Sequence, residues 1–311
     1  MGSRAQDSVI VVTGPTASGK SALALALAER RNGVVINADA MQTYDAFPIL
    51  TAQPSAEERA RVPHVLYGLL PLGETLSAAR WRTLAEAEIE RAHAEGRTPI
   101  LCGGSGLYLR TLMQGIAPIP DAPAELRQQA NEEWQAMGAD TFRARLMEKD
   151  PTIVARLKPG DRQRHVRAWE VWLATGRPLS AWQEGEAKPA PWRFASLLLA
   201  PERGWLRERI ERRFDAMLAG GVLAEARAVF DRNPDPHWPG LKAHGAPELF
   251  RHFRGELTLA EARRIAIDHT RQYAKRQMTW FRHQMAPDLV VDPTTDLGLE
   301  QTEKLLTKTE A

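Results

Sequence analysis

Short apolar runs alternate along the first part of the chain with longer segments in which apolar residues recur every three to four positions. The apolar runs at residues 9–12, 34–39, 98–104 and 194–200 have the length and composition of buried β-strands. The intervening segments include "SALALALAERR" and "SAARWRTLAEAEIERAHAEGR", which are typical of helices. This alternation predicts an α/β fold with a parallel sheet flanked by helices, in which ligands bind beyond the carboxyl ends of the strands.

A proline-rich stretch, "GIAPIPDAP", interrupts this alternation at residues 115–123. From residue 124 to about 185 the pattern is helical throughout, and a second proline-rich stretch precedes the strand at 194–200. We therefore expect an all-helical insertion in an α/β core. The expected bounds are 1–116 for the first part of the core, 117–192 for the insertion, 193–290 for the second part, which ends in basic helices, and 291–311 for a polar tail that is poorly ordered.

The composition is that of a globular protein without a membrane-spanning segment. Hydrophobic residues make up 43% of the chain and charged residues 26%. No apolar run approaches the roughly 20 residues that cross a bilayer, and the first eight residues lack the apolar stretch of a signal peptide. The one cysteine, Cys102, excludes an internal disulfide and a cysteine-based zinc cage, and is expected to be a small buried hydrophobe. These features predict a cytoplasmic protein.

The net charge of +2 conceals two basic islands. Residues 142–182 carry nine Lys or Arg and four Asp or Glu, and residues 251–283 carry eight and three. Such islands on an otherwise acidic chain indicate a polyanionic partner, although solvated helical faces would give the same pattern. Aromatic residues accompany both islands, so basic side chains could follow a phosphate backbone while rings hold an unpaired base. Of these rings, we expect Trp169 and Trp172 to be core.

The motif "GPTASGKS" lies between the first predicted strand and the first predicted helix, the context that a phosphate-binding loop requires. Its glycines permit a tight turn with backbone N–H groups facing an anion, and the following helix adds its positive end. Lys20 supplies a point charge, and Ser21 a hydroxyl for Mg²⁺. The sequence therefore predicts that this loop binds phosphate or diphosphate. The residues of the predicted site are Gly14, Thr16, Ala17, Ser18, Gly19, Lys20 and Ser21.

Two further strand ends carry polar side chains. Asp39 ends the second predicted strand and could take a proton from an incoming nucleophile, or could instead cap a helix or lie behind Mg²⁺. Ser105, in "GGSG", could hold a leaving oxygen or a substrate amine, or cap the next helix. No acidic residue follows the run "PILC", which counts against a motor-type ATPase but leaves a small-molecule kinase open.

Taken together, these motifs resemble the bacterial tRNA dimethylallyltransferase family, over about residues 9–283. The resemblance rests on an ordered set: "GPTASGKS", "INADAMQTY", "ILTAQPS", "GGSGLYLRTLMQGIAPIPDAPAELR", "DRQRHVRAWEVWLATGRPLS", "RERIERRFDAMLAGG" and "TRQYAKRQMTWFRHQ". It implies a P-loop NTPase-like core that transfers a dimethylallyl group from dimethylallyl diphosphate to N6 of the adenine 3′ of a tRNA anticodon. The loop would then grip a diphosphate leaving group with its Mg²⁺.

The resemblance also implies roles for residues. Asp39 would be the general base, Ser105 would hydrogen-bond near the reacting centre, and the insertion would hold the anticodon stem-loop. Arg213, with Arg209 as a neighbour, would join the phosphate loop on the diphosphate. The implied tRNA contacts are Asp39, Ala40, Met41, Gln42, Arg127, Gln163, Arg164, His165, Val166, Arg167 and Arg276. The expected partners are tRNA and dimethylallyl diphosphate, with no membrane, and the enzyme is expected to be a monomer.

The chain departs from the family pattern at three places. Ser105 stands where the family usually has Thr, and Gly106 where a bulkier residue is common. The segment "GLKAHGAPELF" at residues 240–250 lacks the Gly-Tyr-Arg-Gln run of many relatives, so no tRNA contact is assigned to it. Two other functions use the same loop: a small-molecule or nucleotide kinase, and a tRNA-binding protein without catalysis.

Overall fold

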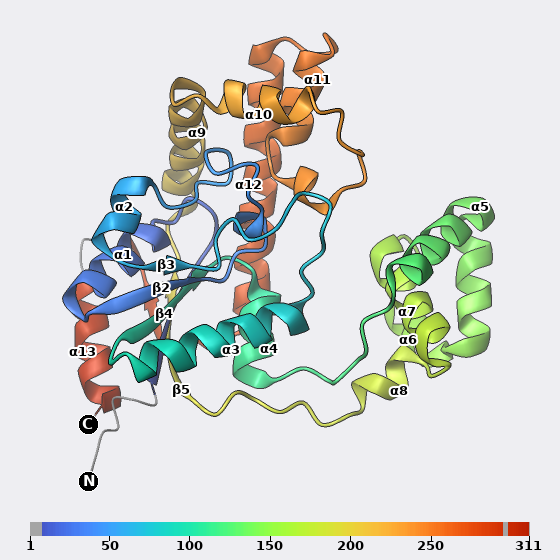
Figure 1. Ribbon diagram of the computed structural model, residues 1–311, viewed down its shortest axis with the longest axis horizontal. Helices are drawn as coiled ribbons and strands as arrows, with labels where there is room; N and C mark the ends of the chain where they lie inside the picture. The colour runs from blue at the N-terminus through green and yellow to red at the C-terminus, as the bar shows by residue number, and fades with distance from the viewer. Residues whose placement is uncertain (1–7, 295–297, 311) are drawn as a thin grey trace. The chain divides into compact units, whose positions relative to one another are not determined.

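The structure is a computed structural model that describes residues 8–294 and 298–310 (Figure 1). The described chain forms two compact units. The first runs up to Met113 and resumes at Ala190, and the second is the segment Gln114–Pro189 between them. The sequence-based boundaries, after residues 116 and 192, lie three residues later at each crossing. Among the described residues, no helix is both long and apolar enough to span a membrane.

The first unit is built on a six-stranded, all-parallel sheet in the order β3-β2-β4-β1-β5-β6. The strands are β1 Ser8–Thr13, β2 Gly33–Asn37, β3 His64–Val65, β4 Thr98–Gly103, β5 Arg193–Leu199 and β6 Leu289–Val291. The fold class expected from the sequence is therefore confirmed. Strand β1 is central, between β4 and β5, and β2 lies beside β4. The loops after β1, β2 and β4 consequently meet at one edge of the sheet.

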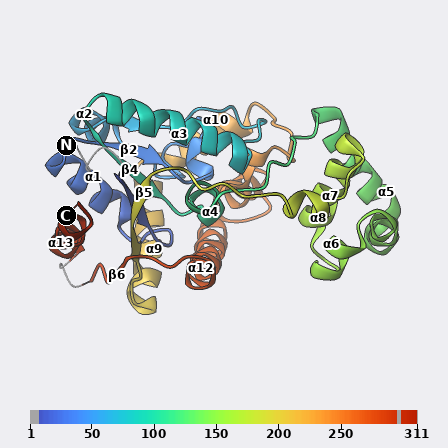
Figure 2. The same ribbon diagram turned by 90° about the horizontal axis from the view of Figure 1, so that it is seen from below.

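Both faces of the sheet are buried, which explains why its strands are continuous apolar runs. Along β1, Val9 and Val11 pack in one hydrophobic cluster and Ile10 and Val12 in the other. The first cluster is shared with α3 and the second with α1 and α13, so these helices cover opposite faces (Figure 2). The helices of this unit are α1 Lys20–Arg30, α2 Ala56–Arg61, α3 Ala78–Ala94, α4 Gly106–Gln114, α9 Arg203–Ala219, α10 Val222–Phe230, α11 Ala246–Phe253, α12 Leu259–Gln284 and α13 Gly298–Glu310, with short 3₁₀ turns η2 Met41–Thr43 and η3 Pro239–Lys242.

The second unit is entirely helical. Its elements are α5 Ala124–Lys149, α6 Pro151–Arg156, α7 Arg162–Thr175 and α8 Leu179–Gln183. Helix α5 contains a break at Gly138, where φ is 73° and ψ 168°, so two helical segments meet there. Phe142 and Leu146 from α5 pack with Trp169 of α7 in a separate core. Trp169 is buried and Trp172 packs partly buried against this core, in agreement with the core assignment of both rings.

The C-terminal segment differs from the expectation of a poorly ordered tail. Helix α13 buries Thr302 and Leu306, and Leu306 packs in the cluster that α1 shares with the sheet. An ion pair of 2.8 Å joins Glu303 to Arg31 at the end of α1. The polar composition concealed this helix because only one narrow stripe of it is buried. Residues 1–7, 295–297 and 311, which belong to the expected N-terminal and tail segments, lie outside the described residues.

Candidate active site

The phosphate loop joins β1 to α1 at the carboxyl edge of the sheet. Gly19 caps α1 with φ 95° and ψ 4°, a left-handed conformation that a side chain would strain. Ala17 also has a positive φ of 64°, and the Ser18 N–H donates to the carbonyl oxygen of Pro15 at 3.2 Å. These turns bring the loop over the amino end of α1, whose partial positive charge favours an anion. The predicted phosphate loop therefore has the conformation that its motif requires.

Two buried side chains of the loop lack the partners that burial demands. The Lys20 Nζ is buried, and the one hydrogen-bond acceptor that it reaches among the described residues is the Pro15 carbonyl oxygen, at 3.4 Å. Burial lowers the pKa of Lys20, and the nearby Asp39 carboxylate opposes that shift. The Ser18 hydroxyl is buried with no hydrogen-bond partner among the described residues. A buried ammonium and an unpaired hydroxyl in one loop are suited to bind an anion that satisfies both.

Helix α9 supplies two further positive charges. The Arg209 Nε donates to the Ala17 carbonyl oxygen at 3.1 Å, and its guanidinium lies over the Trp205 ring at 4.6 Å. The Arg213 Nη1 donates to the Thr16 hydroxyl at 3.4 Å. Burial lowers the pKa of Arg213, with Asp39 opposing this shift and Arg209 adding to it. The structure thus brings both arginines to the phosphate loop, as expected.

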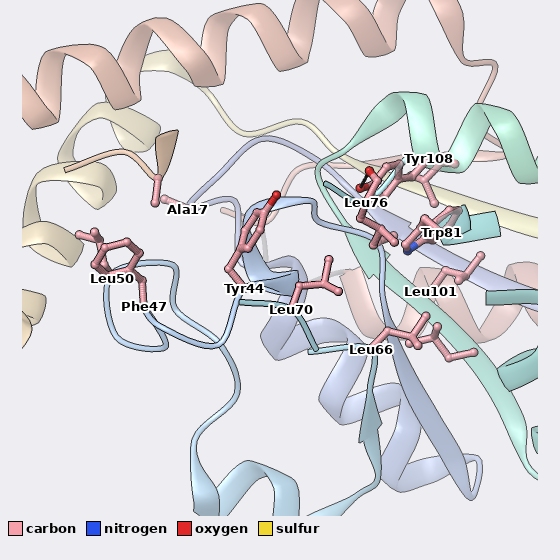
Figure 3. Close-up of a cluster of buried hydrophobic side chains, with 14 of the residues drawn as sticks. Ala17, Tyr44, Phe47, Leu50, Leu66, Leu70, Leu76, Trp81, Leu101 and Tyr108 are labelled. Atoms are coloured by element: carbon pink, nitrogen blue, oxygen red, sulfur yellow. Dashed lines mark hydrogen bonds between the residues drawn. The ribbon is translucent and has the colours of Figure 1, made fainter. Parts of the chain in front are cut away.

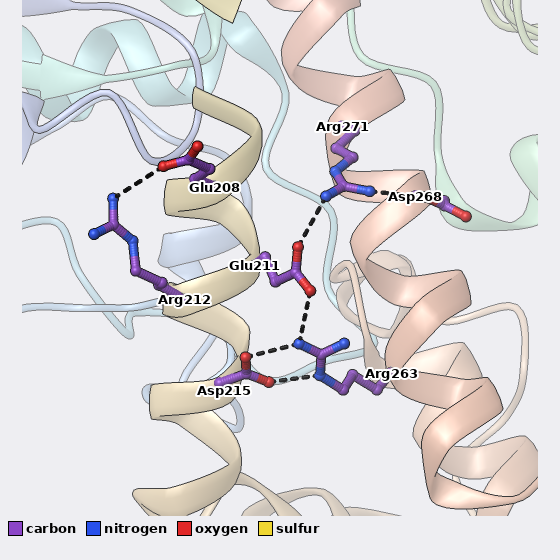
Figure 4. Close-up of polar contacts among 7 residues, drawn as sticks. All are labelled: Glu208, Glu211, Arg212, Asp215, Arg263, Asp268 and Arg271. Atoms are coloured by element: carbon purple, nitrogen blue, oxygen red, sulfur yellow. Dashed lines mark hydrogen bonds and ion pairs between the residues drawn. The ribbon is translucent and has the colours of Figure 1, made fainter. Parts of the chain in front are cut away.

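Ion pairs join α9 to α12 (Figure 4). Arg263 of α12 bonds Asp215 at 2.7 Å and Glu211 at 3.1 Å. Glu211 also receives a hydrogen bond from Arg271 at 3.1 Å, and Arg271 pairs with Asp268 on its own helix. These contacts link α9 to α12, while Ile210 and Phe214 of α9 pack in the hydrophobic core.

Asp39 lies two residues beyond the end of β2, in a turn whose backbone is held from several sides. The Asp39 N–H donates to the Asn37 side chain at 2.8 Å, and the Met41 N–H donates to the Asp39 Oδ1 at 3.0 Å. The fully buried Trp81 donates its Nε1–H to the Asn37 carbonyl oxygen at 2.9 Å and stacks on Tyr108. Figure 3 shows Trp81 and Tyr108 within the hydrophobic cluster to which they belong. Trp81 therefore fixes the strand end from which Asp39 extends.

The phosphate loop, the Asp39 turn and helix α9 enclose one cavity of about 690 Å³. Its lining includes the phosphate loop from Thr16 to Ser21, Asp39, and three arginines of α9, namely Arg209, Arg212 and Arg213. Two carboxylates thus share this space with a strongly positive surface: Asp39, and Glu58, which accepts the Ser55 N–H at 2.7 Å in the cap of α2. An anion bound by the loop would lie beside a group able to accept a proton from its reaction partner.

Ser105 reaches the Asp39 turn and not the cavity. Its hydroxyl accepts a hydrogen bond from the Ala40 N–H at 2.9 Å, and Ser105 is not among the residues that line the cavity. The preceding Gly104 permits close packing, because a Cβ there would lie 2.3 Å from the Nε2 of Gln277. Gly106, a departure from the family pattern, makes room for the Trp280 ring: a Cβ at position 106 would lie 2.2 Å from that ring.

Gln277 of α12 is a site residue that the sequence analysis missed. Its Oε1 accepts the Thr16 N–H at 2.8 Å and its Nε2 donates to the Gly104 carbonyl oxygen at 3.0 Å. It is buried, and it joins the phosphate loop to the loop after β4. The available signal was its position: Ala274, Gln277 and Phe281 form the buried stripe of α12, where a glutamine is unusual.

Among the described residues, no three His, Cys, Asp or Glu side chains gather into a metal-binding cluster. Ser21, the expected Mg²⁺ ligand, lies in the first turn of α1 and lines the cavity. A hydroxyl beside bound phosphate oxygens fits Mg²⁺, which retains several waters and shares ligands with a phosphate substrate. Cys102 is buried, and burial raises its pKa to about 11, so its thiol is not a nucleophile at neutral pH.

The residues expected to contact tRNA divide between the two units. Ala40, Met41 and Gln42 follow Asp39, and the Gln42 Nε2 already donates to the carbonyl oxygens of Thr51 and Ala52 at 3.0 and 2.7 Å. Arg276 is exposed on α12, 5.8 Å from the Tyr273 ring centroid.

In the helical unit, α7 carries five of the expected contacts. Gln163 and Arg164 are exposed, and the partly exposed Arg167 pairs with Glu170 at 3.3 Å. His165 and Val166 have buried side chains, which contradicts direct contact of these side chains with RNA. They lie on the inner face of α7, where side chains three and four positions apart pack with its neighbours. Arg127 of α5 is half-buried, and its Nε has no partner among the described residues.

The chain matches known proteins over most of its length. The IPP transferase family model matches residues 42–284. A tRNA dimethylallyltransferase of Rhodospirillum centenum is 52% identical over 287 residues, which are 92% of this chain and 91% of that protein. One from Granulibacter bethesdensis is 50% identical over 275 residues, 88% of this chain and 86% of that protein.

Solved structures agree. A tRNA isopentenylpyrophosphate transferase from Bacillus halodurans is 32% identical with a TM-score of 0.69, covering 98% of this chain and 97% of that one. A eukaryotic dimethylallyltransferase acting on tRNA is 27% identical with a TM-score of 0.79, covering 96% of this chain and 78% of that one. The phosphate loop, the Asp39 turn and these matches lead to one conclusion: the chain belongs to the IPP transferase family.

Proposed function

We propose that this chain transfers a dimethylallyl group from dimethylallyl diphosphate to N6 of the adenine that follows the tRNA anticodon on its 3′ side, releasing diphosphate. One observation carries the proposal: the phosphate loop, Arg213 and Asp39 line the same cavity. The names of the family relatives, tRNA dimethylallyltransferases, support this reaction over other uses of a phosphate loop.

The proposed chemistry requires little beyond electrostatics and a base. The N6 lone pair forms a bond to the first carbon of the allyl group, and the carbon–oxygen bond breaks with its electron pair moving to diphosphate. Lys20 and Arg213, with Arg209 beside them, stabilise the charge that collects on diphosphate. The N6 proton passes to the Asp39 carboxylate. Ser105 acts in this scheme as a positioning residue, through its hydrogen bond to the Ala40 N–H.

Mg²⁺ is the proposed metal ion. Ser21 would hold it together with oxygens of the diphosphate and water, and it would supply additional positive charge to the leaving group. Besides Arg213 and Arg209, the protein would contribute the positive end of α1, the Lys20 ammonium and the Ser18 hydroxyl to leaving-group binding.

The helical unit is the proposed site for the anticodon stem-loop. Arg164, with Gln163 beside it, offers an exposed polar edge of α7, and Arg167 and Arg127 add charge in the same unit. The target adenine must leave its stack to reach Asp39, which is the usual requirement for chemistry on a base. We also propose that the enzyme acts as a cytoplasmic monomer. The single cysteine, Cys102, is buried, which suits a reducing compartment.

Mass spectrometry of tRNA nucleosides tests the proposal. The protein is incubated with unmodified tRNA, dimethylallyl diphosphate and Mg²⁺, and in parallel with tRNA and ATP. We expect adenosine to gain one dimethylallyl group in the first reaction and ATP to persist in the second. Consumption of ATP without prenylated RNA would instead identify a kinase, and tRNA binding without either reaction would identify a binding protein.

A further inference from the structure

A small side cavity of about 70 Å³ opens beside Asp39. It shares part of its lining with the larger cavity: Thr16, Ala17, Asp39, Thr51, Arg213 and Met217. Ligand cavities for drug-sized molecules are commonly 300 Å³ or more, so this one suits only a small group. Because Thr16 and Arg213 belong to the proposed diphosphate grip, the group attached to that diphosphate is the natural occupant.

Two kinds of surface line this side cavity. The aliphatic side chains of Met41, Leu50 and Ile210 form one part. The rings of Phe214, His244 and Tyr273 form another, and those of His244 and Tyr273 pack against each other with centroids 4.6 Å apart and planes 47° from parallel. Polar residues, among them Asp39 and Arg213, complete the lining where the side cavity meets the larger one. The aliphatic and aromatic parts of the lining match a branched hydrocarbon that becomes positively charged when its leaving group departs.

His244 lies in the segment that departs from the family pattern, at residues 240–250, and no role has yet accounted for it. Its neighbour Gly245 has φ 101° and donates its N–H to Glu248 at 3.1 Å, and a Cβ there would lie 2.8 Å from Leu50. Glu248 is in turn held by His269 of α12 at 2.7 Å. The backbone that presents His244 is therefore fixed, while its ring nitrogens have no hydrogen-bond partner in the part of the chain that the structure describes.

We propose that the His244 ring, packed on Tyr273, is the aromatic wall of the allyl pocket and stabilises the positive charge that develops on the dimethylallyl group as diphosphate leaves. This inference rests on the proposed function. It assigns His244 to the transition state of that reaction: charge appears on the allyl carbons while the carbon–oxygen bond breaks and before the bond to N6 is complete. Only the neutral imidazole can act in this way, because an imidazolium would repel the same charge.

The charged groups around His244 are consistent with a neutral ring. Burial is the largest cause of its lowered pKa. Arg276 and His269 of α12 lower that pKa further, whereas Glu248 of α11 and Asp39 raise it. Arg213 of α9 lines the same cavity, and burial raises the pKa of Tyr273, which keeps the phenol neutral. Below the pKa of His244 the ring becomes an imidazolium, and the rate of transfer should then fall.

Three variants test the assignment: His244→Phe keeps an aromatic face and removes the titration, His244→Leu removes both, and His237→Leu changes an exposed histidine of the same loop as a control. Single-turnover transfer to tRNA is measured at saturating dimethylallyl diphosphate from about pH 5 to 8, the range in which histidine titrates. Affinity for inorganic diphosphate and thermal unfolding are measured for each variant.

We expect His244→Leu to slow transfer by about 2- to 30-fold at neutral pH with diphosphate affinity unchanged, the range of a cation–π contact. His244→Phe should retain most of the neutral rate and lose less activity than the wild type toward acid pH. A leucine variant as fast as the wild type, a phenylalanine variant as slow as leucine, or identical acid profiles for phenylalanine and wild type would each overturn the assignment. If His244→Leu does not fold, the comparison of His244→Phe with the wild type decides. Absence of transfer by the wild type would instead refute the proposed function.

Discussion

At the scale of single residues, the account depends most on Asp39. A carboxylate that takes the N6 proton is expected to contribute roughly 10²- to 10⁴-fold to the rate. We predict that Asp39→Asn slows transfer by this amount in single-turnover measurements and leaves the affinity for tRNA within a few-fold of the wild type. The exposed Asp45 lies in the same loop, and Asp45→Asn is the matched control. An Asp39→Asn enzyme as fast as this control would exclude Asp39 as the base.

Lys20 gives a pH prediction at the same scale. Burial lowers its pKa below the usual 10.5, so the free enzyme loses this charge at a lower pH than an exposed lysine would. Diphosphate affinity, measured by calorimetry, should therefore weaken as the pH rises through the lowered pKa. Lys20→Met should weaken binding by about 10-fold or more at neutral pH and remove this dependence, because a charged hydrogen bond is lost. Lys242→Met, an exposed change, should behave as the wild type; a pH dependence that survives in Lys20→Met would contradict the assignment.

Residue identity predicted some of these positions and not others. The phosphate loop could be predicted from the sequence because its residues form one contiguous motif between a strand and a helix. Asp39 could be predicted because it directly follows an apolar run. Gln277 and His244 could not, because each acts across a long sequence separation: Gln277 bonds Thr16 and Gly104, and His244 meets Asp39 only through a shared cavity. The Ser105 hydroxyl reaches the Ala40 N–H, which no local pattern indicates.

At the scale of elements, α9 must be held in one rotation for its arginines to face the loop. We predict that Arg263→Met costs only about 1 kcal/mol or less of unfolding free energy, since the paired groups are partly exposed, yet weakens diphosphate binding several-fold. The loss should shrink at high salt. Arg282→Met changes an exposed arginine near the end of the same helix, outside this cluster, and serves as the control. Equal diphosphate affinities in the two variants would show that the ion pairs do not orient α9.

The long elements were predictable because periodicity accumulates over many residues. The four apolar runs correspond to β1, β2, β4 and β5. Strands β3 and β6 are two and three residues long, too short to show a period, and the sheet defines them by hydrogen bonding alone. Asp39 was expected at the end of a strand, but β2 ends at Asn37 because the Asn37 side chain turns the chain there.

At the scale of the whole molecule, the second basic island offers RNA less positive charge than its count of Lys and Arg suggests. In the second island, Arg263 and Arg271 are paired with acidic residues of α9 and α12, which leaves less charge for RNA. We predict that Arg164→Ala reduces the dependence of tRNA affinity on salt by about 0.7 to 0.9 in the log–log slope, the value of one phosphate contact. Arg167→Ala should change it less: both arginines have an acidic partner, Asp161 at 3.4 Å for Arg164 and Glu170 at 3.3 Å for Arg167, but the Arg164 side chain is 72% exposed and that of Arg167 only 35%. Filter binding over a salt series measures both, and a slope unchanged by Arg164→Ala would remove Arg164 from the interface.

The central claim is that the phosphate loop binds the diphosphate leaving group of the prenyl donor. The most direct measurement counts diphosphate released against adenosines modified, with tRNA, dimethylallyl diphosphate and Mg²⁺ present and ATP absent. The account predicts one diphosphate for each modified adenosine, and loss of both signals in Lys20→Met. Diphosphate release that does not track modification, or modification that requires ATP hydrolysis, would contradict it.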